Sequence, residues 1–142
     1  MKLILQTRRE ESVAAGDSTG ILKIEPKRPA ILVAILPAAL SSLWEPSIVS
    51  VWMEKDPEDL TEGEPAPGPV FVSARGPVPF LEPIPLGPND SIDCTVTNDG
   101  ATEATVSLTA YLLHLTPGEF ARYEVDEGYR AAIRAYVAQL FR

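Results

Sequence analysis

Short segments in which apolar and polar residues alternate, separated by turn-forming residues, fill the chain from Met1 to Leu115. A period of two places successive side chains on opposite faces of an extended strand, so each segment has one face for a core. Many short strands with regular turns are typical of an antiparallel sandwich or barrel. We therefore predict a mostly β domain over residues 1–115, a jelly-roll-like β-sandwich or barrel of about eight strands.

Two apolar segments in the first half of the chain differ in pattern. Ile31–Leu36 is almost wholly apolar, which is typical of a strand buried on both faces. Ser47–Glu54 alternates instead, with Val49, Val51 and Met53 on one face. The other segments predicted as strands in this region are Lys2–Arg9, Ile21–Glu25 and Val70–Arg75.

The middle of the chain, residues 54–88, is rich in proline and in acidic residues. Nine of the 14 prolines fall between Pro57 and Pro88, and Glu54–Pro69 holds six acids, which predicts a stiff, irregular loop region. Each proline removes a backbone N–H that a strand ladder needs. The stretch that begins at Pro77 is therefore predicted to be an edge strand, a polyproline-like crossover or a contact arm.

Residues 91–115 predict a β-hairpin. Ser91–Thr97 and Ala104–Leu115 both alternate, and the residues Asn98-Asp99-Gly100 between them tolerate left-handed backbone angles. The apolar face of each strand is expected to point toward the core. The predicted inward side chains are Ile92, Cys94, Val96, Val106, Leu108, Ala110 and Leu112.

A C-terminal helical segment is predicted over residues 116–142, where the apolar period changes. Thr116 as the cap, proline in the first turn and Glu119 three residues after the cap form a helix start. Asp126 is a second cap, just before Gly128. The apolar stripe of the second helix packs either on the protein's own sheet or on a partner. It consists of Tyr129, Ile133, Tyr136, Val137 and Leu140.

The formal net charge of −8 is concentrated in the middle of the chain. Residues 1–44 carry 6 bases and 4 acids (+2), residues 45–103 carry 2 and 12 (−10), and residues 104–142 carry 4 and 4 (0). An acidic centre repels phosphate backbones, so no nucleic acid partner is expected. The basic N-terminal segment could instead lie on the acidic middle of a neighbouring copy. No membrane partner is expected either, because the apolar tract Ala30–Leu40 is too short to span a bilayer.

Residues that carry catalysis or bind transition metals are scarce. The chain has one histidine, His114, and one cysteine, Cys94. In the expected hairpin they lie roughly 13 Å apart at about 3.3 Å per residue, too far for a catalytic dyad. We predict no enzyme activity, no cofactor and no metal site. Two alternatives stay open: carboxylates such as Glu82, Asp90 and Asp93 could pair in space, and the acidic loop could bind calcium.

Three features together resemble a virion protein. They are the alternating N-terminal segment Met1–Arg9, the jelly-roll-like order of strands, and the segment Asp90–Tyr111, in which TVTN and VSLT flank a polar turn. This combination over residues 1–115 is similar to small β-rich proteins of tailed bacteriophages, and within them to capsid decoration (auxiliary or cement) proteins. Few Asn, Gln, Met and Cys beside many loop prolines are typical of thermophiles, which suggests a thermophilic phage.

The resemblance implies a virion structural protein, assembled in the host cytoplasm, that binds the major capsid protein on the outer capsid surface as a homotrimer. Binding to several capsid subunits would stabilise the lattice. The contacts are expected in an N-terminal arm of residues 1–9 and in the proline-rich segment. The expected contact residues are Leu3, Leu5, Arg8, Arg9, Phe80 and Leu81.

A monomeric ligand-binding β-sandwich, which would bind a carbohydrate or a receptor, is the alternative function. Trp44 and Trp52, with Phe80 and Tyr111, could form an aromatic platform for a sugar. Trp52 shares a face with Ile48, which favours a position in the core instead.

Overall fold

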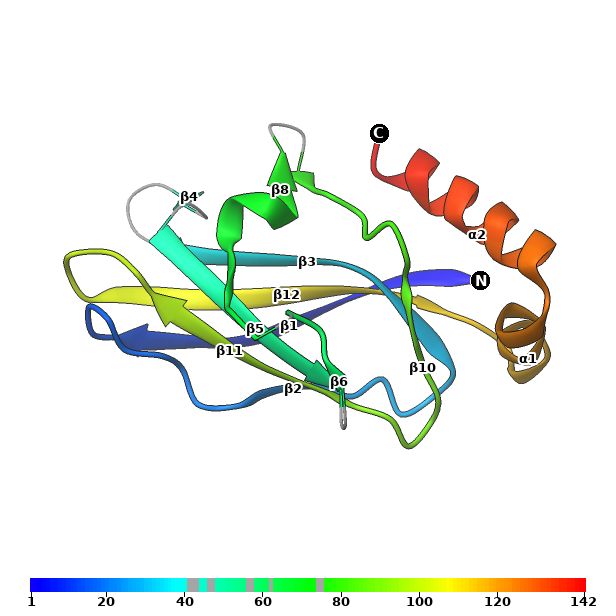
Figure 1. The fold of residues 1–142 in the computed structure, drawn as a ribbon, viewed down its shortest axis with the longest axis horizontal. Coiled ribbons are helices and arrows are strands. Elements are labelled where there is room, and N and C mark those ends of the chain that lie inside the picture. Colours follow the sequence, from blue (N-terminus) through cyan, green and yellow to red (C-terminus); the bar gives the residue numbers. More distant parts are fainter. Residues whose placement is uncertain (41–43, 46–47, 56–57, 62, 74–75) are drawn as a thin grey trace.

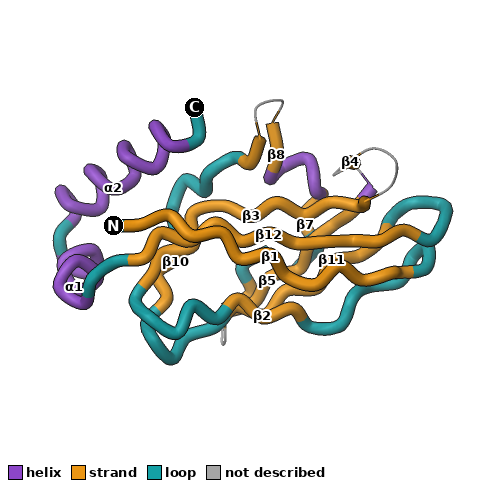
Figure 2. Tube along the Cα trace, turned by 180° about the vertical axis from the view of Figure 1, so that it is seen from behind, coloured by secondary structure: helices purple, strands orange, loops and turns teal. Residues whose placement is uncertain are grey.

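Two antiparallel sheets face each other across an apolar core, and two helices lie together at one end, beside the N-terminus (Figures 1 and 2). The predicted mostly β sandwich with a C-terminal helical segment is confirmed. The computed structural model describes residues 1–40, 44–45, 48–55, 58–61, 63–73 and 76–142.

The first sheet carries both ends of the β domain. Its strand order is β1-β12-β3-β10, and β4 pairs with β3 off this path. β1 and β10 are therefore the edge strands of this path. The bounds are β1 Lys2–Val13, β3 Ala30–Leu40, β4 Trp44–Glu45, β10 Ile84–Leu86 and β12 Ala104–His114.

The second sheet has the order β2-β11-β5-β6, and β7 pairs with β5 off this path. Its bounds are β2 Leu22–Ile24, β5 Val49–Lys55, β6 Glu58–Asp59, β7 Ala66–Pro67 and β11 Ile92–Asn98. In the described residues, five of the twelve strands are only two residues long. The other seven strands are longer, against the prediction of about eight strands.

A small third sheet of β8 (Val72–Ser73) and β9 (Gly76–Pro77) follows a 3-10 helix over Gly68–Phe71. The single strand predicted over Val70–Arg75 is therefore wrong, although Ala74 and Arg75 lie outside the described residues. Glu54–Pro69 was predicted as a loop. The structure instead has two short strands in this range, β6 and β7, and each of them pairs with β5.

Strand β3 is buried on both faces, as its apolar run predicted. Leu32 and Ile35 lie in the cluster between the two sheets. Ile31 and Val33 lie in a second cluster, on the opposite face, which the helices cover. All four side chains are fully buried. β3 therefore links the sandwich core to the helix pair.

β11 and β12 do not form the predicted hairpin. β11 pairs with β2 and β5 in one sheet, whereas β12 pairs with β1 and β3 in the other. The predicted inward side chains of both strands are nevertheless buried in the same core cluster. The turn is thus an arch that carries the chain across the core, because alternation selects the buried face and not the strand's partner.

The side chain of Asn98 holds this arch in place. Its amide nitrogen donates hydrogen bonds to the backbone oxygens of Val13 and Thr102, both at 2.9 Å, and its amide oxygen accepts one from the Gly100 N–H at 2.9 Å. Asn98 is fully buried. A buried amide with these bonds joins the arch to the end of β1 in the opposite sheet.

The N-terminal segment is not an arm that extends from the domain. Residues 2–8 of β1 pair with β12 of the same chain, and after a register shift Glu11–Val13 pair with it again. Of the three forms predicted for the proline-rich stretch, the structure shows the edge strand. This strand, β10, pairs with Ala30–Leu32 of β3 through Ile84, Pro85 and Leu86. Both segments are thus integrated into the first sheet at opposite edges.

Both helices begin at the caps that the sequence predicts. α1 spans Pro117–Val125 and α2 spans Glu127–Leu140. Thr116 and Glu119 form the reciprocal capping box, and Asp126 accepts a hydrogen bond from the Tyr129 N–H at 3.0 Å. Within the described part of the chain, no helix is both long and apolar enough to cross a membrane.

The apolar side of the helix pair packs on the protein's own sheet. Ile133 and Val137 of α2 and Tyr123 of α1 are buried in the second cluster, against Ile31 and Leu113. The sequence left open whether the apolar stripe packs on the protein's own sheet or on a partner, and in the structure it packs on the protein's own sheet. Tyr136 and Leu140 of the predicted stripe remain partly exposed.

Replacement of Asn98 tests the arch. Asn98→Ala leaves the buried oxygen of Val13 without its donor, so the free energy of unfolding should fall by about 2 kcal/mol. Asp99→Ala is the matched control: the exposed neighbour should change stability by less than about 0.5 kcal/mol. Equal denaturation midpoints for the two variants would show that the amide does not stabilise the arch.

Replacement of Ile133 tests the packing of the helices on the sheet. Ile133→Ala creates a cavity between α2 and the sheet, and urea unfolding should show a loss of about 2–5 kcal/mol. Gln139→Ala, an exposed change on the same helix, should leave the unfolding free energy within about 0.5 kcal/mol. An unaffected Ile133→Ala variant would mean that the helix pair contributes nothing to the stability of the sandwich.

Candidate functional site

The structure describes the side chains of two of the four contact residues that were predicted on β1. Leu3 is half-buried and packs against the helix-covered cluster, so its side chain is engaged within the chain. Leu5 is 56% exposed. Arg8 pairs with Leu108 through the backbone and Arg9 lies in the register shift, but their side chains lie outside the description. Among the described strands β1 has a partner on one side only, so Leu5 sits on an open sheet edge.

The two contact residues predicted in the proline-rich segment have opposite roles. The Phe80 N–H donates to the Val33 oxygen at 2.8 Å, and the Phe80 ring meets Phe71 edge-on with centroids 6.5 Å apart. Phe80 therefore anchors the segment to the core. Leu81, the next residue, is 93% exposed. The anchor holds Leu81 out into solvent.

The anchored segment is also fixed on either side of Phe80. The Val78 N–H donates to the Phe71 oxygen at 2.8 Å. Glu82 forms an ion pair with Arg134 of α2 at 3.3 Å, and Arg134 also binds Glu127 at 2.9 Å. These contacts tie the proline-rich segment to the 3-10 helix on one side and to α2 on the other.

An apolar groove of about 470 Å³ lies beside this segment, lined by residues of both sheets, such as Met53 of β5 and Ile84 of β10. Its walls come from β5, β7, the 3-10 helix and the proline-rich segment. The described residues that line it are Met53, Leu60, Thr61, Ala66, Val70, Phe71, Phe80, Glu82 and Ile84. The groove joins the sandwich core, because Met53 and Phe71 of its walls belong to the core cluster.

Sequence reasoning did not find this groove. Its residues are spread over 53–84, and only tertiary packing brings them together. A signal was nevertheless present: Leu60 is a large apolar residue within Glu54–Pro69, a stretch that was predicted to be a loop.

One acidic residue, Glu82, lines the groove, and Asp59 directly precedes the lining residue Leu60 in the chain. Asp59 accepts hydrogen bonds from the backbone N–H of Thr61 at 3.0 Å and of Gly63 at 2.9 Å. Desolvation raises the pKa of Asp59, but the hydrogen bonds from Thr61 and Gly63 outweigh it and lower the pKa below its usual value. Asp59 therefore stays ionised at neutral pH. Glu58 and Glu64, beside it in the chain, are exposed.

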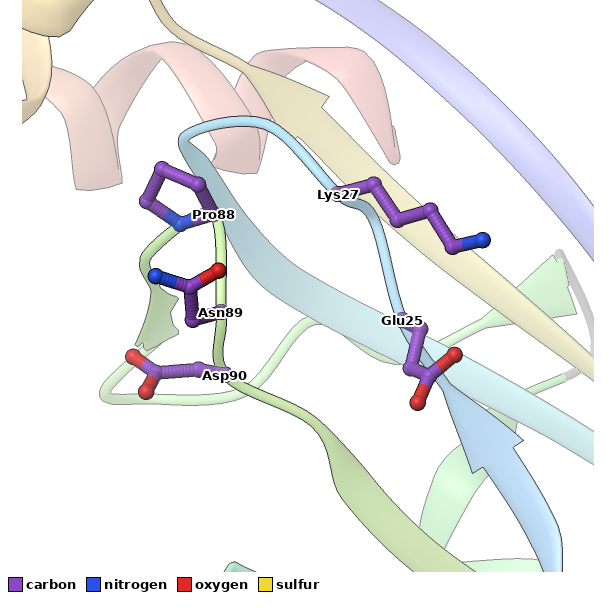
Figure 3. A pocket seen from close by; sticks show the side chains of 5 residues that line it. All are labelled: Glu25, Lys27, Pro88, Asn89 and Asp90. Atoms are coloured by element: carbon purple, nitrogen blue, oxygen red, sulfur yellow. The ribbon is translucent and has the colours of Figure 1, made fainter.

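A second, polar pocket of about 420 Å³ lies between the loop after β2 and the loop after β10. It is lined by Glu25, Lys27, Pro88, Asn89 and Asp90. Figure 3 shows that these side chains do not converge: Lys27 points away from the opposite loop, and the Asp90 carboxylate points away from Lys27. This arrangement offers no pair of groups aimed at one reacting atom.

The carboxylates that could have paired in space are each bound to a different base. Glu82 pairs with Arg134 at 3.3 Å, Asp93 with Lys23 at 3.7 Å, and Asp90 with Lys55 at 3.9 Å. Within the described ranges, no three His, Cys, Asp or Glu side chains are grouped to hold a metal ion.

Cys94 and His114 lie in different sheets, so the expected spacing along a hairpin does not apply to them. Cys94 is fully buried in the core cluster, and its thiol is out of reach of a substrate. His114 pairs with Lys2 and Ala30 at the end of the first sheet. Its buried Nε2 makes no hydrogen bond within the described part of the chain.

The aromatic residues of the proposed sugar platform are separated. Tyr111 packs edge-on against Phe141, with ring centroids 5.5 Å apart, on the helix-covered side of its sheet. Phe80 packs on the core instead. Trp52 is half-buried on the face of β5 opposite the core residues Val51 and Met53, so the core position favoured for it is wrong. The side chain of Trp44 lies outside the description.

No protein-family model matches the chain, and neither a curated protein nor a solved structure matches it. Function is therefore inferred from the residues themselves. The features available for this inference are the exposed side chains of Leu5 and Leu81, the open edge of β1 and the apolar groove.

The single histidine permits a direct test of the end of the first sheet. Burial, followed by the charges of Arg28 and Lys2, lowers the pKa of His114 below its ordinary 6.5. An NMR titration of the imidazole resonances in the folded protein should therefore have its midpoint below pH 6.5. A midpoint at or above that value would contradict this placement.

The free energy of unfolding should depend on pH because of the same shift in the pKa of His114. Because the unfolded chain binds the proton more tightly, the contribution of neutral His114 is complete above pH 6.5 and is lost as the pH falls through the lowered folded-state pKa. His114→Gln, which cannot titrate, should remove this part of the pH dependence of the unfolding free energy.

Proposed function

We propose that this chain is a virion structural protein that binds the major capsid protein on the outer capsid surface and stabilises the lattice. Leu81 carries the proposal: a large apolar side chain, 93% exposed, on a segment that neighbouring contacts hold in place. At this exposure Leu81 buries almost no apolar area within the chain, so it adds little to the stability of the chain itself. A partner that buries it gains apolar contact.

The anchoring of Leu81 favours tight binding. Phe80 is fixed to Val33, and Glu82 is fixed to Arg134. A contact that is ordered before binding loses little conformational entropy when the partner arrives. A rigid apolar contact therefore suits a permanent lattice better than a transient encounter.

The proposal includes the assembly: a homotrimer at points where capsid subunits meet, in a tailed phage of a thermophilic host. Each copy bound to several subunits would shift the equilibrium away from disassembly by mass action. No catalysis is required for this function. The burial of Cys94 and the separate pairing of the carboxylates agree with a binding role.

The alternative, a monomeric carbohydrate- or receptor-binding module, has less support. A sugar platform needs neighbouring exposed aromatic rings. Among the described candidates, Tyr111 and Phe80 pack in different clusters, and Trp52 is the one that remains on an outer sheet face.

Co-sedimentation with empty capsids of the virus that encodes this chain tests the proposal. Leu81→Asp should weaken capsid binding at least about tenfold, because a charge replaces the apolar contact. Val125→Asp, at a side chain that is 83% exposed at the end of α1, is the matched control and should bind normally. Both variants should have the same melting temperature as the wild type.

Undiminished capsid binding by Leu81→Asp would overturn the proposed contact, and absence of binding by the wild type would overturn the function. Deletion of residues 1–9 is a poorer test, because it removes most of strand β1 from the first sheet.

A further inference from the structure

We propose that the outer face of the second sheet, around Trp52, binds an arginine-bearing segment of a partner protein. The inference goes beyond the capsid contact at Leu81 and does not rest on it. The strands of this sheet lie in the order β2-β11-β5-β6 (Figure 1). Because core-facing residues alternate with outward ones along a strand, neighbouring strands together build the outer face.

One large aromatic ring, that of Trp52, lies on this face. Trp52 is half-buried and belongs to neither core cluster. In the register it pairs with Thr95 of β11. An indole ring attracts cations over its face more strongly than the ring of any other side chain. No cation of the described part of the chain lies over the Trp52 ring, so the ring is available to a cation from a partner.

A row of three acidic residues lies next to Trp52 on the same face. Glu54 is two residues after Trp52 on β5. Its direct cross-strand neighbours are Asp93 of β11 and Asp59 of β6. Like charges directly opposite each other on a sheet are destabilising, and a bound cation relieves that repulsion. Within the described ranges these carboxylates do not group into a metal site, so the row suits an extended cationic segment.

The bases of the chain leave Glu54 unpaired. Lys23 is paired with Asp93 at 3.7 Å, and both of these side chains are about half exposed. Lys55 follows Glu54 on β5 but points to the opposite face, where its ammonium group donates to the Pro85 oxygen at 2.9 Å. The Glu54 carboxylate is exposed and makes no ion pair or hydrogen bond with any residue that the structure describes.

Arginine fits this ring and this carboxylate better than lysine does. Its planar guanidinium stacks on an aromatic ring and binds a carboxylate through two parallel N–H groups, whereas the lysine ammonium is a compact, strongly hydrated point charge. Trp52 and Glu54 lie about 7 Å apart along β5, because each residue of a strand advances it by roughly 3.3 Å. One guanidinium therefore reaches both the ring and the carboxylate.

A neutral sugar is the competing occupant of an exposed indole ring. Tyr111 and Phe80, the other described candidates for a sugar platform, pack in the two core clusters and add no ring to this face. A neutral ligand also gains nothing from the negative charge of the acidic row. The charge of the face therefore favours a cationic partner.

Calorimetric titration with octa-arginine, and with octa-lysine as a probe of equal charge, tests the proposal. Octa-arginine should bind about three- to tenfold more tightly than octa-lysine. Trp52→Leu and Glu54→Gln should each weaken octa-arginine binding about three- to tenfold, and added salt should weaken it further. Glu124→Gln, which removes the same charge from an exposed position on α1, is the matched control and should bind like the wild type.

The exposed Glu54 keeps the test decisive even where Trp52→Leu lowers stability, because Glu54→Gln should melt like the wild type. Equal losses for Glu54→Gln and Glu124→Gln would show that the peptide follows net charge alone, and they would overturn the proposal. Equal affinities for the two peptides, with no change in Trp52→Leu, would also overturn it.

NMR separates a cationic partner from a sugar. The indole N–H resonance of Trp52, assigned by its absence in Trp52→Leu, should shift on addition of octa-arginine and stay in place on addition of the neutral sugar maltohexaose. A shift with maltohexaose and none with octa-arginine would assign this face to a carbohydrate and overturn the arginine contact.

Discussion

The structure depends on one strand that is buried on both faces. β3 turns Leu32 and Ile35 toward the second sheet. It turns Ile31 and Val33 toward the helices, and the oxygen of Val33 also holds the backbone of Phe80. Loss of cover on either face would expose apolar surface to water, so the sheets, the helix pair and the proline-rich segment stabilise one another.

The two edges of the first sheet differ in what they can bind. β10 carries Pro85, which has no N–H to donate to a further strand. β1 contains no proline, and its Leu5 is 56% exposed. One edge therefore offers an exposed strand, and the other borders an apolar groove. This asymmetry suits contacts between unlike patches rather than a contact between two identical ones.

The polar groups favour binding over chemistry. Asp59 and Asp126 accept backbone hydrogen bonds that order a turn and a helix start. Glu82 and Asp93 are each paired with a different base. Carboxylates used in this way fix the shape of the surface, and the excess of 20 acidic over 12 basic residues leaves the net charge negative. A rigid acidic surface with a few exposed apolar side chains is what the proposed lattice protein would present to its partners.

The sequence by itself determined the long strands, the buried faces of β3, β11 and β12 and the starts of both helices, but not the short elements within residues 58–73. The alternation around Cys94, the double burial of Ile31–Leu36 and the caps at Thr116 and Asp126 all follow from interactions within a few residues. Tertiary structure alone decided the partners: β11 and β12 joined opposite sheets, and β1 paired within its own chain. It also assembled the groove from residues spread over 53–84. The physical reason is that alternation states which side chains avoid water, whereas long-range packing selects the surface against which they do so.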